Sequence, residues 1–189
     1  MTATPSIHAI CVYCGSADGV HADYLSAARQ MGTLLAARGI RLVYGAGRTG
    51  LMGALAEGAL AAGGEVSGFV PENMNLPELV HESLTALDVL PDIQARKARM
   101  SAAADAFIAL PGGYGTFDEL FETLTWAQIG LHHKPVGLLN VRGYYDPLLN
   151  MISRASQEKF IYSEQDVVLV SDSDPEALLQ KLLNLSPAR

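Results

Sequence analysis

Positive charge, cysteine and long apolar runs are all scarce in this sequence of 189 residues. Thirteen lysines and arginines stand against 20 acidic residues, and the resulting net charge of −7 argues against non-specific attraction to nucleic acid or to an anionic membrane. No apolar run approaches the ~18–20 residues of a membrane-spanning helix. The first ten residues also lack the charged and apolar regions of a signal peptide. We therefore expect a cytoplasmic protein without nucleic-acid or membrane partners.

The two cysteines, Cys11 and Cys14, are separated by two residues in the order C-V-Y-C. A thioredoxin-like redox pair has this spacing, but there the pair opens a helix, whereas Cys11 lies inside the first expected strand. A structural zinc site needs more ligands, and no histidine or carboxylate lies nearby at the spacing of a zinc motif. We expect both cysteines to act as small buried apolar side chains, and we expect no metal site.

Apolar runs and turn residues alternate along the chain in a way that is typical of an α/β protein. The 49% hydrophobic content is enough for a full core, and the length predicts a single domain over residues 1–189. Strands are expected at residues 7–13, 40–44, 65–70, 84–90, 106–110, 136–140 and 167–171. Helices are expected at residues 22–38, 51–62, 92–103, from about 116 onward, 145–159 and 175–183. This order predicts a Rossmann-like, doubly wound parallel sheet with helices on both faces.

The most informative stretch joins the fifth expected strand to the helix that follows it. The strand is a continuous apolar run, and Pro111 ends it. Three of the next four residues are glycines, which let a backbone approach a ligand closely. Beyond them the apolar side chains have the spacing of one buried helix face, at Phe117, Leu120, Phe121 and Leu124. A glycine turn at the start of a helix directs free N–H groups and a positive dipole end at one spot, which favours a phosphate.

Glu119 has two interpretations that the local sequence does not separate. Thr116 and Glu119 have the T-x-x-E spacing of a capping box, in which the glutamate only returns a hydrogen bond to the N-cap residue. The same glutamate would also lie one turn into a helix that starts at a phosphate site. A role in capping and a role in chemistry are therefore both open at this point.

A second glycine-rich loop, Gly45-x-Gly47-x-x-Gly50, fits the dinucleotide-binding fingerprint. It follows the second strand rather than the first, however. The acidic residue about 15 positions further on, Glu65, begins the next strand, whereas an acid that binds ribose should come near the end of that strand. We prefer a second ligand-facing glycine turn to an NAD site, although Gly50 also suits close packing of helix and strand.

The only dense basic cluster consists of Arg96, Lys97 and Arg99, in the helix that leads to the glycine-turn strand. Such a cluster is usually a solvated helix face, and Arg99 fits that interpretation. Arg96 or Lys97 could face the ligand instead, since an arginine binds phosphate or ribose oxygens with two parallel hydrogen bonds.

These motifs together resemble the LOG (Lonely Guy) family of cytokinin riboside 5′-monophosphate phosphoribohydrolases. The segment from Pro111 to Glu119 is similar to the family's PGGxGTxxE motif. Further matches follow in family order across nearly the whole chain: Cys14-Gly15-Ser16, Val43-Tyr44-Gly45, Gly50-Leu51-Met52-Gly53, Arg96-Lys97-x-x-Met100, Leu124-Thr125-Trp126-Ala127-Gln128, Lys134-Pro135-Val136-Gly137 and Gly143-Tyr144-Tyr145-Asp146.

The resemblance implies a particular reaction and a particular set of residues. The family hydrolyses the N-glycosidic bond of a purine nucleoside 5′-monophosphate and releases the free base and ribose 5-phosphate. Its catalytic pair maps onto Arg96 and Glu119. The resemblance also implies a homodimer, and it implies that neither a metal nor an organic cofactor is needed. Substrate contacts are expected from Gly15, Ser16, Gly45, Glu78, Arg96, Lys97, Gly112, Gly113, Tyr114, Gly115, Thr116 and Thr125.

The sequence departs from the family pattern at three places. Ala46 replaces the middle glycine of a usual G-G-G, Ile93-Gln94-Ala95 replaces a usual M-H-x before Arg96, and Asp118 stands where glutamate is usual. A non-catalytic nucleotide-binding or carrier protein of the same fold stays open as the alternative function. A pyridoxal-phosphate decarboxylase does not fit, because none of the four lysines has the setting of a Schiff-base lysine.

Overall fold

The computed structural model describes residues 7–161 and 167–185. The rest of the domain predicted over residues 1–189 lies outside this description. Within it, strands lie at Ala9–Tyr13 (β1), Arg41–Tyr44 (β2), Val66–Pro71 (β3), Ala86–Leu90 (β4), Ala106–Ala109 (β5), Val136–Leu139 (β6) and Leu169–Asp172 (β7). Helices lie at Ala22–Ala37 (α1), Gly50–Ala61 (α2), Ile93–Ala102 (α3), Tyr114–Gln128 (α4), Asp146–Gln157 (α5) and Pro175–Asn184 (α6), with 3₁₀ turns at Glu72–Met74 (η1) and Val141–Gly143 (η2).

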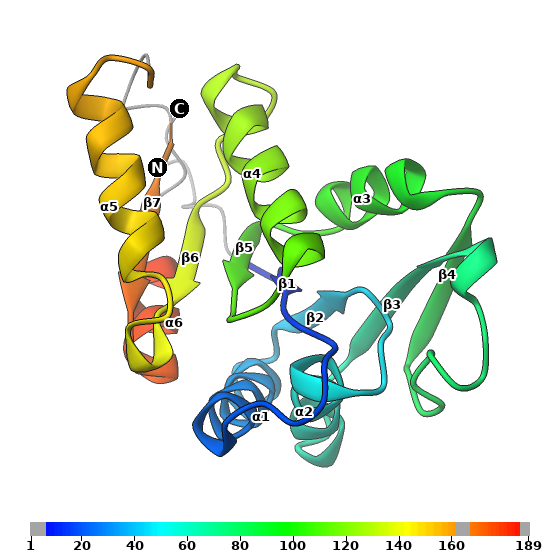
Figure 1. Cartoon of the computed structure of the whole chain (residues 1–189). Coiled ribbons are helices and arrows are strands. Elements are labelled where there is room, and N and C mark those ends of the chain that lie inside the picture. Colours follow the sequence, from blue (N-terminus) through cyan, green and yellow to red (C-terminus); the bar gives the residue numbers. More distant parts are fainter. Residues whose placement is uncertain (1–6, 162–166, 186–189) are drawn as a thin grey trace, which may run out of the picture.

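All seven of these strands run parallel in one sheet, in the order β4-β3-β2-β1-β5-β6-β7. The chain builds outward from β1 to β4 and then returns to place β5 beside β1 (Figure 1). Cys11 marks this centre, because it pairs with Val43 of β2 on one side and with Phe107 of β5 on the other. The α/β, doubly wound fold predicted from the sequence is confirmed, with its switch point between β1 and β5.

Two apolar layers cover the sheet, one on each face, as the alternation of side chains along a strand requires. Ile10 and Val12 of β1 join the layer formed with α1, α2 and α6. Cys11 and Tyr13 point the other way, into the layer formed with α3, α4 and α5. Figure 1 shows α1 and α2 side by side below the sheet. Among the described residues, no helix is long and apolar enough to cross a membrane.

Local sequence determined most helix ends. Gly39 follows α1 with a φ of 65°, as a glycine at the C′ position does, and Asp174 caps α6 by accepting a hydrogen bond from Ala177 N (2.8 Å). The helix expected over residues 92–103 is observed as α3, Ile93–Ala102. The helix begins at Ile93, because the side chain of Asp92 accepts a hydrogen bond from Ala95 N (2.8 Å) and fixes the N-cap there.

Candidate active site

Three loops meet beyond the carboxyl ends of β1, β2 and β5. Gly15, in the loop after β1, donates a backbone hydrogen bond to Pro111 O (3.1 Å) and accepts one from Leu51 N at the start of α2 (3.0 Å). Thr49 adds a side-chain hydrogen bond to Ser16 O (2.7 Å). The loop after β1 therefore joins the two glycine-rich loops at the switch point of the sheet, where doubly wound proteins bind ligands.

The glycine turn after β5 leads directly into α4, whose N-cap residue is Gly113. The helix begins at Tyr114, so Thr116 lies within its first turn and is not the N-cap. The capping-box interpretation of Glu119 required a helix that starts after Thr116, and it is wrong. The helix's first backbone hydrogen bond runs from Phe117 N to Gly113 O (3.0 Å). Earlier N–H groups of the turn have no acceptor inside the helix and are available to an anion.

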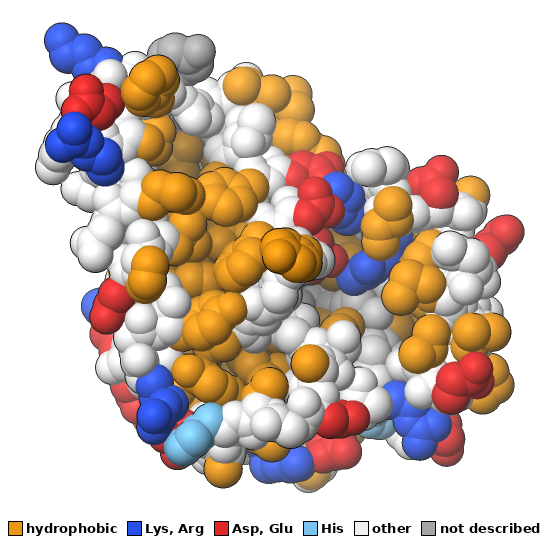
Figure 2. Space-filling model, viewed as in Figure 1, with side chains coloured by type: hydrophobic (Ala, Val, Ile, Leu, Met, Phe, Trp, Pro, Cys, Tyr) orange, Lys and Arg blue, Asp and Glu red, His pale blue; other side chains and the backbone are white. Residues whose placement is uncertain are grey.

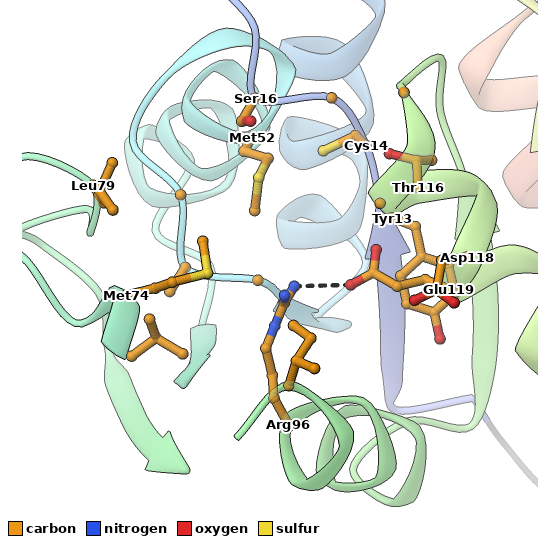
Figure 3. A pocket seen from close by; sticks show the side chains of 18 of the residues that line it. Tyr13, Cys14, Ser16, Met52, Met74, Leu79, Arg96, Thr116, Asp118 and Glu119 are labelled. Carbon is orange, nitrogen blue, oxygen red and sulfur yellow. Dashed lines mark hydrogen bonds and ion pairs between the residues drawn. The ribbon is translucent and has the colours of Figure 1, made fainter. Parts of the chain in front are cut away.

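Arg96 of α3 and Glu119 of α4 point toward each other in the cavity next to this turn (Figure 3). Arg96 Nη2 lies 2.8 Å from Glu119 Oε1, and the two side chains are only 12% and 11% exposed. Arg96 Nε is buried and has no hydrogen-bond partner among the residues that the structure describes. An arginine has five N–H donors, and the pair with Glu119 uses the Nη2 group.

Gly45 makes room for this guanidinium group. A Cβ atom at position 45 would lie 2.1 Å from Arg96 Nη2 and 2.9 Å from Met52 Cε, so any larger residue would displace both side chains. The next residue, Ala46, has a φ of 62°. This left-handed conformation costs an alanine about 1–2 kcal/mol, which explains why a glycine suits the position.

Burial controls the charge of Glu119. Desolvation raises its pKa from the ordinary 4.5 to about 7, although the charge of Arg96 acts in the opposite direction and Asp118 adds to the rise. The cost of burying the carboxylate thus outweighs its ion pair. A carboxyl group with this pKa populates both its protonated and its ionised form near neutral pH, which is what a group that accepts and returns a proton needs.

Lys97 lines the same cavity, but its ammonium group is turned toward α4. It lies 2.9 Å from Asp118 Oδ2 and also pairs with Glu122, and its side chain is 8% exposed. Burial lowers the pKa of Lys97, yet the hydrogen bonds and charges of the two carboxylates outweigh burial, and the pKa is raised. Lys97 therefore stays charged and fixes α3 against α4.

The cavity has a volume of about 460 Å³, within the usual range for a small-molecule site. The glycine turns, Arg96 and Glu119 form its polar side. Its other side is apolar and includes Met52, Met74 and Leu79, which Figure 3 places on the wall away from Glu119. Such a division suits a ligand with a charged end and an apolar end.

The segment that carries part of the apolar wall, residues 72–83, is attached to the loop after β2. Arg48 N donates a hydrogen bond to Leu79 O (3.0 Å), and His81 N donates one to Ala46 O (2.9 Å). The side chain of Arg48 adds a bond to Pro77 O (3.0 Å). These bonds hold the segment over the cavity. The sequence patterns predicted no helix or strand for residues 71–83 and gave no sign that Met74 and Leu79 would line a cavity.

Cys11 and Cys14 are free and buried, on opposite faces of the sheet. Burial raises the pKa of both thiols well above the ordinary range, so neither forms a reactive thiolate near neutral pH. In the described part of the chain, no group of three or more His, Cys, Asp or Glu side chains is arranged to hold a metal ion.

Comparison with known proteins identifies the family. The family model described as "Possible lysine decarboxylase" matches residues 52–182. "Cytokinin riboside 5′-monophosphate phosphoribohydrolase LOG1" of Arabidopsis thaliana is 45% identical over 178 residues, which cover 94% of this chain and 84% of that protein. The chain belongs to the LOG family. A second member, "Probable cytokinin riboside 5′-monophosphate phosphoribohydrolase LOGL3" of Oryza sativa subsp. japonica, is 46% identical over 177 residues, 94% of this chain and 84% of its own.

A solved structure with the same fold is a molybdenum cofactor binding protein from the phototrophic bacterium Rippkaea orientalis. It is 25% identical, covers 92% of this LOG-family chain and 93% of its own, and superposes with a TM-score of 0.68. Proteins described as acting on different ligands therefore share this architecture, so the function follows from the site and not from the fold.

Most of the substrate-binding and catalytic residues expected in this LOG-family chain lie around the one cavity. Gly112 lies behind it, where a Cβ atom would be 2.1 Å from Thr116 Oγ1. Glu78 and Thr125 are exposed and do not line the cavity, and Thr125 donates its hydroxyl to Phe121 O (2.7 Å) on α4. The expected residues that do line it are Gly15, Ser16, Gly45, Arg96, Lys97, Gly113, Tyr114, Gly115, Thr116 and Glu119.

Proposed function

We propose that this protein hydrolyses the N-glycosidic bond of adenosine 5′-monophosphates, with or without an N6 substituent, to free base and ribose 5-phosphate. The observation that carries the proposal is the buried pair of Arg96 and Glu119, which faces a 460 Å³ cavity beside a glycine-rich phosphate turn. The names of the curated relatives point to the same reaction.

The phosphate would bind at the start of α4. Gly113, Tyr114 and Gly115 line the cavity there, the first N–H groups of a helix have no acceptor within it, and the helix dipole favours negative charge. Fixing the phosphate holds C1′ of the ribose near Glu119. The binding energy of the phosphate helps to orient C1′ for reaction, so a nucleoside without the phosphate should react poorly.

The reaction would follow the chemistry of other glycoside hydrolyses. As the bond between C1′ and the base nitrogen breaks, its electron pair leaves with the base and positive charge develops on the ribose ring. The Glu119 carboxylate stabilises this charge and takes a proton from the water molecule that attacks C1′. The leaving base takes up one proton and Glu119 releases the one it gained, so the net reaction adds one water molecule across the bond. An arginine does not readily release a proton, so Arg96 orients Glu119 and binds the ribose or phosphate oxygens.

The apolar wall supports a purine ring and an apolar N6 substituent as the other end of the substrate. Met52 and Met74 contribute flexible thioether side chains, which adapt to irregular apolar ligands. The division of the cavity places this wall opposite the polar groups that would hold ribose and phosphate.

Two other functions are less well supported. A carrier protein would need the phosphate turn but not a carboxylate buried at energetic cost beside Arg96. A lysine decarboxylase that uses a Schiff base would need a neutral lysine amine in the cavity. Lys97 is the only lysine among the described residues that line it, and two carboxylates keep it charged.

We further propose that the protein forms a homodimer through the outer face of α4 and α5. Figure 2 shows apolar side chains gathered over this side of the molecule next to the hollow of the cavity. Tyr114 is 93% exposed, and Phe121 and Met151 are also exposed. A second copy would cover these side chains and lie close to Thr125.

The two free thiols suit a reducing compartment and support the cytoplasmic location predicted from the sequence.

The test is a chromatographic assay of the purified protein with AMP, N6-isopentenyladenosine 5′-monophosphate and the unphosphorylated riboside, without added metal or cofactor. We expect free base and ribose 5-phosphate from the two monophosphates only, and loss of both products in Glu119→Gln. Release of no base from any compound, with nucleotide binding intact, would instead identify a nucleotide-binding protein.

A further inference from the structure

Two neighbouring tyrosines hold the phosphate turn from behind. Tyr144 donates its hydroxyl to Gly112 O, and Tyr145 donates its hydroxyl to Leu110 O (2.6 Å). Both come from the segment between η2 and α5, beside the carboxyl end of β6. Neither tyrosine lines the cavity, whereas Gly113 does. The two hydroxyls therefore act on the side of the turn that a ligand does not touch.

The two tyrosines fix different peptide groups, and only the peptide held by Tyr144 has an N–H group that could bind a ligand. A peptide group is planar and trans, so its C=O and N–H point in opposite directions. Tyr144 draws the carbonyl of Gly112 away from the cavity, which directs the N–H of Gly113 toward it. Tyr145 fixes the carbonyl of Leu110, but the next residue is Pro111, which has no N–H to direct.

The peptide between Gly112 and Gly113 is the one in this turn with the least intrinsic preference for a single orientation, since neither flanking residue has a Cβ. No heavy atom lies within 4 Å of a Cβ built on Gly113, so the Gly113 side of this peptide is not packed, whereas Gly112 packs closely against Thr116 and Gly15. If this peptide rotated, it would present a carbonyl oxygen to the phosphate in place of an N–H donor.

Tyr144 itself is held firmly. Its ring stacks on Phe117 of α4 (centroids 6.5 Å apart, 15° between planes) and meets Tyr24 and Tyr145 edge-on at 6.0 Å and 5.1 Å. Tyr145 N donates in turn to Asn140 Oδ1 (2.6 Å). A hydroxyl fixed by rigid aromatic packing loses little entropy when it forms its hydrogen bond, so it can oppose rotation of the peptide.

We propose that Tyr144 is a positioning residue, which locks the peptide between Gly112 and Gly113 with its N–H facing the phosphate of the substrate. This inference rests on the proposed function only in naming the phosphate as the ligand. Loss of the hydroxyl lowers the fraction of molecules whose turn is competent to bind, and the apparent affinity falls by that fraction. Loss of one hydrogen bond corresponds to a decrease of about three- to tenfold.

The experiment measures binding of ribose 5-phosphate and of inorganic phosphate by calorimetry, together with thermal unfolding, for Tyr144→Phe and Tyr145→Phe. These ligands are not hydrolysed, so the result is independent of whether the protein is an N-glycosidase. We expect Tyr144→Phe to raise both dissociation constants about three- to tenfold, and Tyr145→Phe to lower Tm with both constants unchanged. Tyr24→Phe, which alters the same aromatic cluster, should change neither constant.

Three results would overturn the proposal. Unchanged binding in Tyr144→Phe would mean that the peptide keeps its orientation without the hydroxyl. An equal loss of binding in Tyr144→Phe and Tyr145→Phe would mean that both tyrosines only support the fold. Failure of the unaltered protein to bind either ligand would show that the turn is not a phosphate site, and would also overturn it.

Discussion

Replacing Glu119 with glutamine should stabilise the protein at the same time as it abolishes hydrolysis. The folded-state pKa of Glu119 lies near 7 against an ordinary value of 4.5. Below pH 4.5 the carboxyl group is protonated in both the folded and the unfolded state. Between pH 4.5 and 7 the unfolded chain releases the proton and the folded protein keeps it, so the free energy of unfolding falls as the pH rises. The accumulated penalty above pH 7 is about 3 kcal/mol.

Glutamine has nearly the shape of the protonated carboxyl group and carries no charge to desolvate. Glu119→Gln should therefore gain up to about 3 kcal/mol at pH 8, which for a chain of this size corresponds to an increase in Tm of about 6 to 12 °C. The gain should shrink as the pH falls and vanish near pH 4.5. Differential scanning calorimetry of both proteins across pH 4.5–8.5 measures this difference directly.

Glu122→Gln provides the matched control, because Glu122 lies on the same helix and pairs with Lys97. Removal of its charge leaves the 8% exposed ammonium group of Lys97 with only one partner, so Tm should fall at pH 8. A lower Tm for Glu119→Gln than for the unaltered protein at pH 8 would refute the argument that burial outweighs the ion pair with Arg96. A difference in Tm between the two proteins that does not change with pH would refute it as well.

Four further predictions concern the site and the proposed dimer. The value of kcat/KM should rise with pH through about 7, because Glu119 must lose its proton to act; a flat profile between pH 6 and 8 would contradict this. Gly45→Ala should lower kcat at least tenfold by displacing Arg96, whereas a change in Tm without a change in kcat would count against it. Lys97→Met should shift the rise of kcat/KM to higher pH, because the positive charge of Lys97 lowers the pKa of Glu119. Phe121→Asp should convert a dimer into a monomer in light scattering, and an unchanged mass would exclude this face as the interface.

Much of the fold could be predicted from the sequence because its determinants are local. Largely apolar stretches of five to seven residues between turn signals predicted every described strand to within two residues at each end. The glycine turn and the start of a helix after it were also visible, because glycines and helix periodicity act over a few residues. The resemblance to the LOG family selected Arg96 and Glu119, which local reasoning left among several possibilities.

Only the tertiary structure determined how Arg96 and Glu119 interact. Arg96 and Glu119 are 23 residues apart, and their contact depends on how α3 and α4 pack on the same face of the sheet. The raised pKa of Glu119 is a property of its burial, and burial is a sum over neighbours from distant segments. The apolar wall and the tyrosines behind the phosphate turn likewise come from segments far along the chain. Sequence periodicity predicts the local elements, while the packing of those elements sets the distances and desolvation on which the chemistry depends.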